Sequence, residues 1–181
     1  MKNIIKVLRS QFIKFDIDGY IIPKNDEYFS EYSNKDRLKE VSNFTGSAGY
    51  AVVLKNKNYL FVDGRYTIQA RIESGKKFTI LDYSEIINCN VFKNLKIGFD
   101  PKLFTSNQIK KIFSNNSPKP IKKNLINEII SFKKIKIKPF YSLDQKITGE
   151  SHQKKIKRVI RYLNKNKLDH IFITAPENVA W

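Results

Sequence analysis

The chain has few of the residues that build disulfide-stapled, metal-clustered or membrane-embedded proteins. Its 181 residues include one cysteine, Cys89, and two histidines. A single cysteine can neither form an intrachain disulfide nor supply a cysteine-rich metal cluster. No apolar run approaches the roughly 18 residues of a membrane helix, and the start of the chain mixes lysine with isoleucine, unlike a signal peptide. We therefore expect a cytoplasmic protein with no membrane span.

Arginine is scarce although the chain is strongly basic. Lys and Arg number 34 against 17 acidic residues, a formal net charge of +17, but only 6 of the 34 are Arg. Basic surfaces bind nucleic acids by neutralising phosphates, yet this recognition favours the planar guanidinium of Arg. Because the lysines are scattered, we interpret the charge as a solvated, lysine-biased surface and expect no nucleic-acid partner. A functional basic patch is the alternative.

The chain contains enough apolar residues to form a core, since 41% of its residues are hydrophobic and 13% are aromatic. Short β-rich runs alternate with amphipathic stretches, which predicts an α/β domain. Strands are expected at residues 19–22, 50–54, 59–62, 78–81 and 96–99, and helices at 2–14, 66–72 and 105–113. Polar residues 55–58 predict a hairpin turn, and Thr105 or Ser106 can cap the third helix. Arg9 is expected on the polar face of the first helix.

The composition of the chain changes between residues 131 and 143, where lysines alternate with isoleucines and Pro139 interrupts this pattern. We place a domain boundary there. The predicted organisation is a first domain over residues 1–132, a linker over 133–147 and the start of a second domain over 148–181. In that second part, the spacing predicts an amphipathic helix at 151–166, a turn at Asn166-Lys167 and a strand at 169–174. We expect this second α/β unit to be truncated.

No residue pattern predicts catalysis or metal binding in this chain. His152 and His170 lie 18 positions apart, and neither has a second ligand at metal-binding spacing. Cys89 is flanked by asparagines, and nothing nearby in sequence would activate its thiol. We therefore expect no catalytic residue, no metal ligand and no cofactor in the stretch.

Two clusters of small and charged residues stand out. Gly46-Ser47-Ala48-Gly49 precedes a strand and lacks the spacing, the ending and the following helix of a phosphate-binding Walker loop. We expect its small residues to let the backbone pass close to a neighbour. In Asp63-Gly64-Arg65-Tyr66, Asp63 can cap a helix, Gly64 can take a positive φ and Arg65 can pair with a carboxylate. We interpret both clusters as structural, although a catalytic role for the second is conceivable.

A series of short motifs runs through nearly the whole chain in a recognisable order. They are Gly19-Tyr20-Ile21-Ile22-Pro23, Ser30-Glu31-Tyr32, Phe44-Thr45-Gly46-Ser47-Ala48-Gly49, Val62-Asp63-Gly64-Arg65-Tyr66, Ile97-Gly98-Phe99-Asp100-Pro101, Asn124-Leu125-Ile126, Thr148-Gly149-Glu150-Ser151 and Asn178-Val179-Ala180-Trp181. Each alone is weak, but their order and spacing resemble those of the cytosolic-type Xaa-Pro aminopeptidases (aminopeptidase P), in their creatinase-like amino-terminal domain and the start of their middle domain.

The resemblance implies a longer enzyme of three parts, in which this chain supplies a creatinase/prolidase-like mixed sheet flanked by helices and the first piece of a similar middle domain. The family's carboxy-terminal pita-bread domain carries two metal ions, commonly manganese, on two Asp, one His and two Glu. It removes the first residue from short peptides with proline second. None of those ligands matches a position here, so the resemblance implies a non-catalytic front part that shapes cleft access and subunit packing, with a homodimeric parent. Asp63, Arg65 and Tyr66 would be framework residues.

Two other function classes stay open. One is a catalytically dead peptidase-like module that binds proteins, as in a histone-chaperone subunit of the same architecture, although a basic chain suits basic histones poorly. The other is a nucleic-acid-binding protein, which would need aromatics interleaved with Arg on an exposed sheet face. The aromatics here fall mostly within apolar runs. A fragment, a split-gene product and a remnant are the alternatives for the origin of the chain.

Overall fold

The computed structural model describes residues 3–30, 34–87, 89–114, 116–132, 139 and 141–180. The chain divides into two compact units, residues 1–133 and 134–181. Every strand in the described residues belongs to the first unit. No helix in these ranges is both long and apolar enough to cross a membrane.

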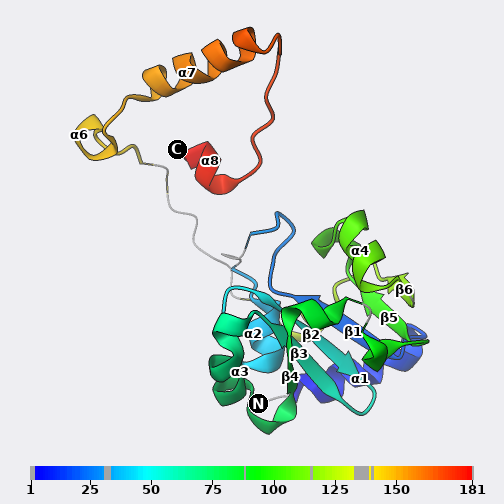
Figure 1. Cartoon of the computed structure of the whole chain (residues 1–181). Helices are drawn as coiled ribbons and strands as arrows, with labels where there is room; N and C mark the ends of the chain where they lie inside the picture. Colours follow the sequence, from blue (N-terminus) through cyan, green and yellow to red (C-terminus); the bar gives the residue numbers. More distant parts are fainter. Residues whose placement is uncertain are drawn as a thin grey trace. The chain divides into compact units, whose positions relative to one another are not determined.

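The first unit is built on a six-stranded mixed sheet with the order β4-β3-β2-β1-β5-β6 (Figure 1). Its strands are β1 (Gly19–Pro23), β2 (Gly49–Leu54), β3 (Asn58–Val62), β4 (Thr79–Asp82), β5 (Lys96–Phe99) and β6 (Ser117–Pro120). β2 runs antiparallel to β1 and β3, and the other neighbouring pairs are parallel. All strands except β2 therefore end at one edge of the sheet, which we call the carboxyl edge.

Side chains alternate along the strands and divide the core between the two faces of the sheet. Tyr20 and Ile22 belong to one buried cluster, whereas Ile21 between them belongs to the other. The first face is covered by α1 (Ile4–Lys14), α2 (Arg37–Ser42), α3 (Thr67–Ser74) and α5 (Leu125–Ile129), and the second by α4 (Ser106–Ile112) with short 3-10 turns. This arrangement confirms the predicted α/β class, a mixed sheet flanked by helices.

Most of the expected elements of the first unit form, and the differences have physical causes. The hairpin pairs Tyr50 with Phe61, as its turn predicted. No sequence signal predicted β6, because Pro118 and Pro120 each remove a backbone donor, which an edge strand tolerates. Arg9, expected on the polar face of its helix, is partly buried. Its Nε donates to the Leu54 carbonyl at 2.8 Å, so the guanidinium holds α1 against β2.

The second unit contains α6 (Gln145–Thr148), α7 (His152–Lys165) and α8 (Pro176–Ala180). The amphipathic helix and the turn after it are confirmed by α7 and by Asn166-Lys167. The strand predicted at residues 169–174 is wrong, because a strand needs a hydrogen-bonded neighbour and the described residues of this unit provide none. Phe172 there is 90% exposed.

Several of the expectations fall on residues outside the described ranges. These are Lys2 of the predicted first helix, Glu31 and Tyr32 of one motif, Trp181 of another, and residues 133–138 and 140 of the predicted linker. The linker at 133–147 and a second domain from 148 therefore stay predictions.

Candidate functional site at the carboxyl edge

The structure brings three motifs of the first unit together at the carboxyl edge. Gly46-Ser47-Ala48-Gly49 enters β2 at this edge, Asp63-Gly64-Arg65-Tyr66 follows β3, and Asp100-Pro101 follows β5. Residues 24–30 leave β1 on the same side. Ligands of open α/β sheets bind beyond the carboxyl ends of the strands. This edge is therefore the first place to look for a site.

The Gly46–Gly49 segment passes close to its neighbours. A Cβ on Gly49 would lie 2.9 Å from the Phe61 carbonyl oxygen, and a Cβ on Gly46 would run into the Phe44 ring. Such approaches leave room only for glycine. The Ser47 hydroxyl lies 2.9 Å from the Tyr66 hydroxyl. The segment thus packs closely against the β2–β3 hairpin and is hydrogen-bonded to the Asp63–Tyr66 turn.

The Asp63–Tyr66 turn carries an exposed ion pair. The Asp63 carboxylate accepts from the backbone N–H of Arg65 at 3.0 Å and from its Nε at 2.8 Å. These bonds, the side-chain one first, hold the pKa of Asp63 below its usual range. Asp63 therefore caps the turn, and Arg65 pairs with its carboxylate. The positive φ expected for Gly64 is wrong: Gly64 lies in a 3-10 turn, and a Cβ added to it would meet no atom within 4 Å.

A buried polar network that the sequence did not predict lies behind this edge. Asn124 donates to the Asp100 carboxylate at 2.9 Å, and the Leu125 N–H donates to the Tyr20 hydroxyl at 3.4 Å. Burial raises the pKa of Tyr20 above its ordinary value. The fully buried Arg37 donates from Nε to Asn127 at 2.9 Å and also binds Glu27. The network joins β1, β5, α2 and α5, and only the fold brings its members together.

The acidic residues at the ends of the strands are all used as caps. Asp63, Asp82 and Asp100 each accept a backbone N–H two residues on, from Arg65, Ser84 and Lys102. Across the described part of the chain, no three His, Cys, Asp or Glu side chains gather in a group that could hold a metal ion. The two histidines, His152 and His170, lie in the second unit. The Cys89 thiol is half-buried, and this burial raises its pKa. The described residues of the carboxyl edge thus provide a shaped surface and hydrogen-bonding groups, and they contain no group of metal ligands.

Comparisons with known proteins identify this architecture. A family model of the creatinase/prolidase N-terminal domain matches residues 5–129, and a second model of the same description matches residues 132–181. The probable Xaa-Pro aminopeptidase P of Coprinopsis cinerea is 30% identical, over 98% of this chain and 31% of its own length. Xaa-Pro aminopeptidase 2 of Rattus norvegicus is also 30% identical, over 98% of this chain and 29% of its own.

Two solved structures of related peptidases share this fold. The X-prolyl aminopeptidase of Caenorhabditis elegans, described as a cytosolic enzyme with a di-nuclear active site, has a TM-score of 0.71 at 26% identity, over 92% of this chain and 32% of that one. The Xaa-Pro dipeptidase of Bacillus anthracis has a TM-score of 0.56 at 21% identity, over 70% and 34%, and shows the shared fold. The chain spans less than a third of the curated relatives, in their amino-terminal part. It belongs to the creatinase/prolidase N-terminal domain family and matches the amino-terminal region of Xaa-Pro aminopeptidases.

Proposed function

We propose that this chain is the non-catalytic amino-terminal portion of a dinuclear-metal Xaa-Pro aminopeptidase, which removes the first residue from peptides with proline at position two. The observation that carries the proposal is the 30% identity to such enzymes over 98% of the chain. A homodimeric, cytoplasmic parent accompanies the proposal, and the cytosolic description of the C. elegans enzyme supports its location.

The described residues do not fit the two metal ions of the proposed parent. Metal ions of such sites need several carboxylate or imidazole ligands around one point. Within the ranges that the structure describes, no three His, Cys, Asp or Glu side chains come together around one point. We therefore assign both ions, which we expect to be manganese, to the part of the relatives that lies outside the match.

The role proposed for this segment is to shape access to the cleft and to contribute to subunit packing. The surface of α3 supports it: Ile68 and Ile72 lie one turn apart on its outer face and are 74% and 77% exposed. Contiguous exposed apolar side chains are typical of contact surfaces. The ordered Asp63–Arg65 pair lies just before this helix.

The experiment compares this chain with the longest open reading frame that continues past Trp181. Release of the first residue from a short Xaa-Pro peptide is measured with and without manganese, and a matched peptide with alanine in place of proline serves as control. Activity only in the longer product, lost on chelation and absent with the alanine peptide, is the expected result. A folded longer product without activity would favour a catalytically dead protein-binding module.

A further inference from the structure

A hollow of about 660 Å³ opens in the first unit, at the ends of the strands opposite the carboxyl edge. Its walls are the first turns of α1, the end of α2, and Asn58 and Lys77 near the starts of β3 and β4. Three cationic side chains line it, those of Lys6, Arg9 and Lys77. We call it the basic hollow.

Neutral acceptors hold Arg9 in one orientation at this hollow. Its Nε donates to the Leu54 carbonyl at 2.8 Å, and its Nη2 donates to the Asn58 side-chain oxygen at 2.9 Å. The Asn58 amide nitrogen donates in turn to the Lys77 carbonyl at 2.8 Å. No described residue accepts a hydrogen bond from Nη1 of Arg9. Burial lowers the pKa of Arg9. The guanidinium therefore presents a partly buried charge with donors that remain available to a ligand.

The charge of Arg9 is not paired as that of the other buried arginine is. The fully buried Arg37 forms an ion pair with Glu27. Within the ranges that the structure describes, no carboxylate lies within ion-pair distance of Lys6, Arg9 or Lys77. Charges that are removed from water are normally paired, because an unpaired one costs free energy. An anion bound in the basic hollow would supply the partner that Arg9 lacks.

The balance of charge around the hollow favours an anion with more than one charge. Among the described residues of its lining, Glu40 is the one acid. It offsets at most one of the three cations, so two positive charges remain. The first turn of α1 also lines the hollow, contains no acidic residue and adds the positive end of an 11-residue helix. Phosphate groups suit this setting, because guanidinium and ammonium groups form charge-assisted hydrogen bonds with them.

The hollow also has an apolar part. Ile4, Ile5 and Val41 belong to its lining. A volume of about 660 Å³ lies in the range of small-molecule sites and exceeds what a phosphate group alone would fill. The ligand that fits both parts therefore carries an apolar group beside its phosphate.

We infer that the basic hollow binds a phosphorylated small molecule, with the phosphate between Lys6, Arg9 and Lys77 and an apolar group against Ile5 and Val41. The inference is independent of the proposed function, since it invokes neither a peptide substrate nor a metal ion. It assigns a role to part of the chain's net charge of +17.

NMR titration of the 181-residue chain at fixed ionic strength tests the inference. The probes are phenyl phosphate, inorganic phosphate and benzoate. We expect phenyl phosphate to shift the backbone resonances of Ile5, Lys6 and Val41 saturably. It should bind about fivefold more tightly than inorganic phosphate, which lacks the apolar group. Benzoate keeps the ring but carries a single charge, and it should bind about tenfold more weakly than phenyl phosphate. Equal binding of benzoate and phenyl phosphate would overturn the assignment of a phosphate ligand.

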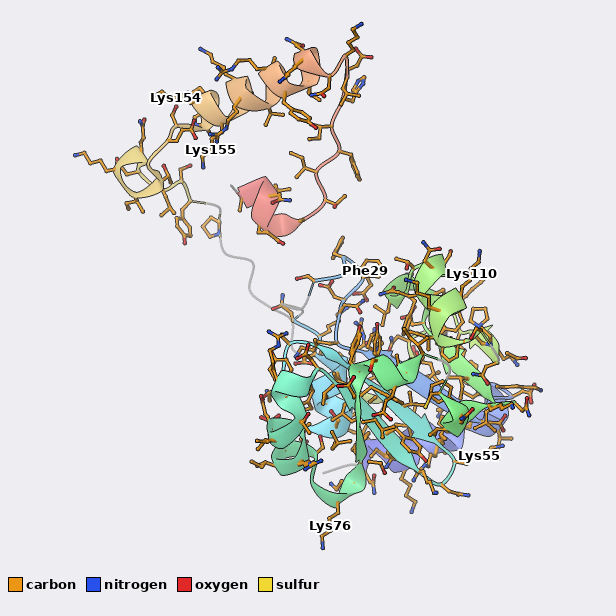
Figure 2. All side chains as sticks on the ribbon, viewed as in Figure 1. Phe29, Lys55, Lys76, Lys110, Lys154 and Lys155 are labelled. Atoms are coloured by element: carbon orange, nitrogen blue, oxygen red, sulfur yellow. The ribbon has the colours of Figure 1, made fainter. Side chains whose placement is uncertain are left out.

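Two neighbouring lysines provide a matched pair of variants. Lys77 lines the hollow, whereas Lys76 is not among its lining residues and extends away from the first unit at the end opposite Phe29 (Figure 2). Lys77→Gln should weaken the binding of phenyl phosphate about fivefold, and Lys6→Gln should have a similar effect. Lys76→Gln removes the same charge and should stay within about twofold of the wild type. These exposed lysines are chosen because Arg9→Gln would also remove the bond that holds α1 against β2.

The pattern of losses decides the inference. Equal losses for Lys76→Gln and Lys77→Gln would assign the binding to general surface charge and overturn the site. Resonance shifts confined to residues outside the lining, or shifts that do not saturate, would also overturn it. Urea midpoints of the lysine variants that match the wild type show that weaker binding does not come from unfolding.

Discussion

The hydroxyl groups of Ser47 and Tyr66 meet at 2.9 Å, although 19 positions separate them in the chain. This bond joins the two clusters that the sequence singled out, one before β2 and one after β3. The Tyr66 ring also packs edge-on against Phe44 at 5.8 Å between centroids. The two clusters are therefore parts of one framework at the carboxyl edge.

The first prediction concerns this bond. Ser47→Ala and Tyr66→Phe should each lower the free energy of unfolding by about 1 kcal/mol, because each removes one partner of a half-buried hydrogen bond. The double variant should lose less than the sum, with a coupling of about 0.5–1 kcal/mol, measured by urea unfolding. Tyr28→Phe, at an exposed hydroxyl, is the control. Strictly additive losses would show that the hydroxyls do not interact.

The second prediction contrasts two glycines. Gly49→Ala should destabilise the chain by about 2 kcal/mol, because the new Cβ would lie 2.9 Å from a backbone oxygen that cannot move aside. Gly64→Ala should be neutral or stabilising by about 0.5 kcal/mol, because its Cβ would meet no atom within 4 Å and its φ is not positive. Urea midpoints of the two variants give the comparison. A large loss at Gly64 would contradict the geometry of the turn.

The third prediction decides between the two possible caps of α4. Thr105 forms a capping box with Gln108, and its hydroxyl accepts from the Gln108 N–H at 3.2 Å. Thr105→Ala should therefore lower the free energy of unfolding by about 1 kcal/mol. Ser106→Ala, the matched change one position later, should stay within about 0.5 kcal/mol of the wild type in the same thermal melts. A larger loss of stability for Ser106→Ala than for Thr105→Ala would show that Ser106, and not Thr105, caps the helix.

The fourth prediction concerns pH. Hydrogen bonds from the Lys55 side chain and the Lys96 N–H lower the pKa of Asp18 in the folded state. The stability contributed by this depressed pKa is fully present above the unfolded value of about 4 and is lost as the pH falls through the folded value. Asp18→Asn should thus lower the urea midpoint near neutral pH, and the difference from the wild type should shrink towards pH ~2. Asp169→Asn serves as control. A difference that does not change with pH would assign the effect to packing alone.

Local pattern was sufficient wherever a segment's own residues determine its conformation. The α1 and α7 helices follow from their apolar spacing, and the β2–β3 hairpin follows from a polar turn between two β-rich runs. The misplaced strand at residues 169–174 shows the limit, because β-rich composition does not form a strand without a partner. Arg9 and Arg37 show the same limit for charged side chains, since their burial depends on partners 45 and 90 positions away.

The sequence by itself determined the α/β class, the order of most elements and the family resemblance, because periodicity and short motifs are local properties of a chain. Only the tertiary structure decided that three motifs of the first unit share one edge of the sheet and that strand-ending carboxylates act as caps. It also decided that Tyr50, Tyr83 and Phe29 line one hollow. Strand order and parallel pairing bring together residues far apart in the chain, and no local pattern encodes that proximity.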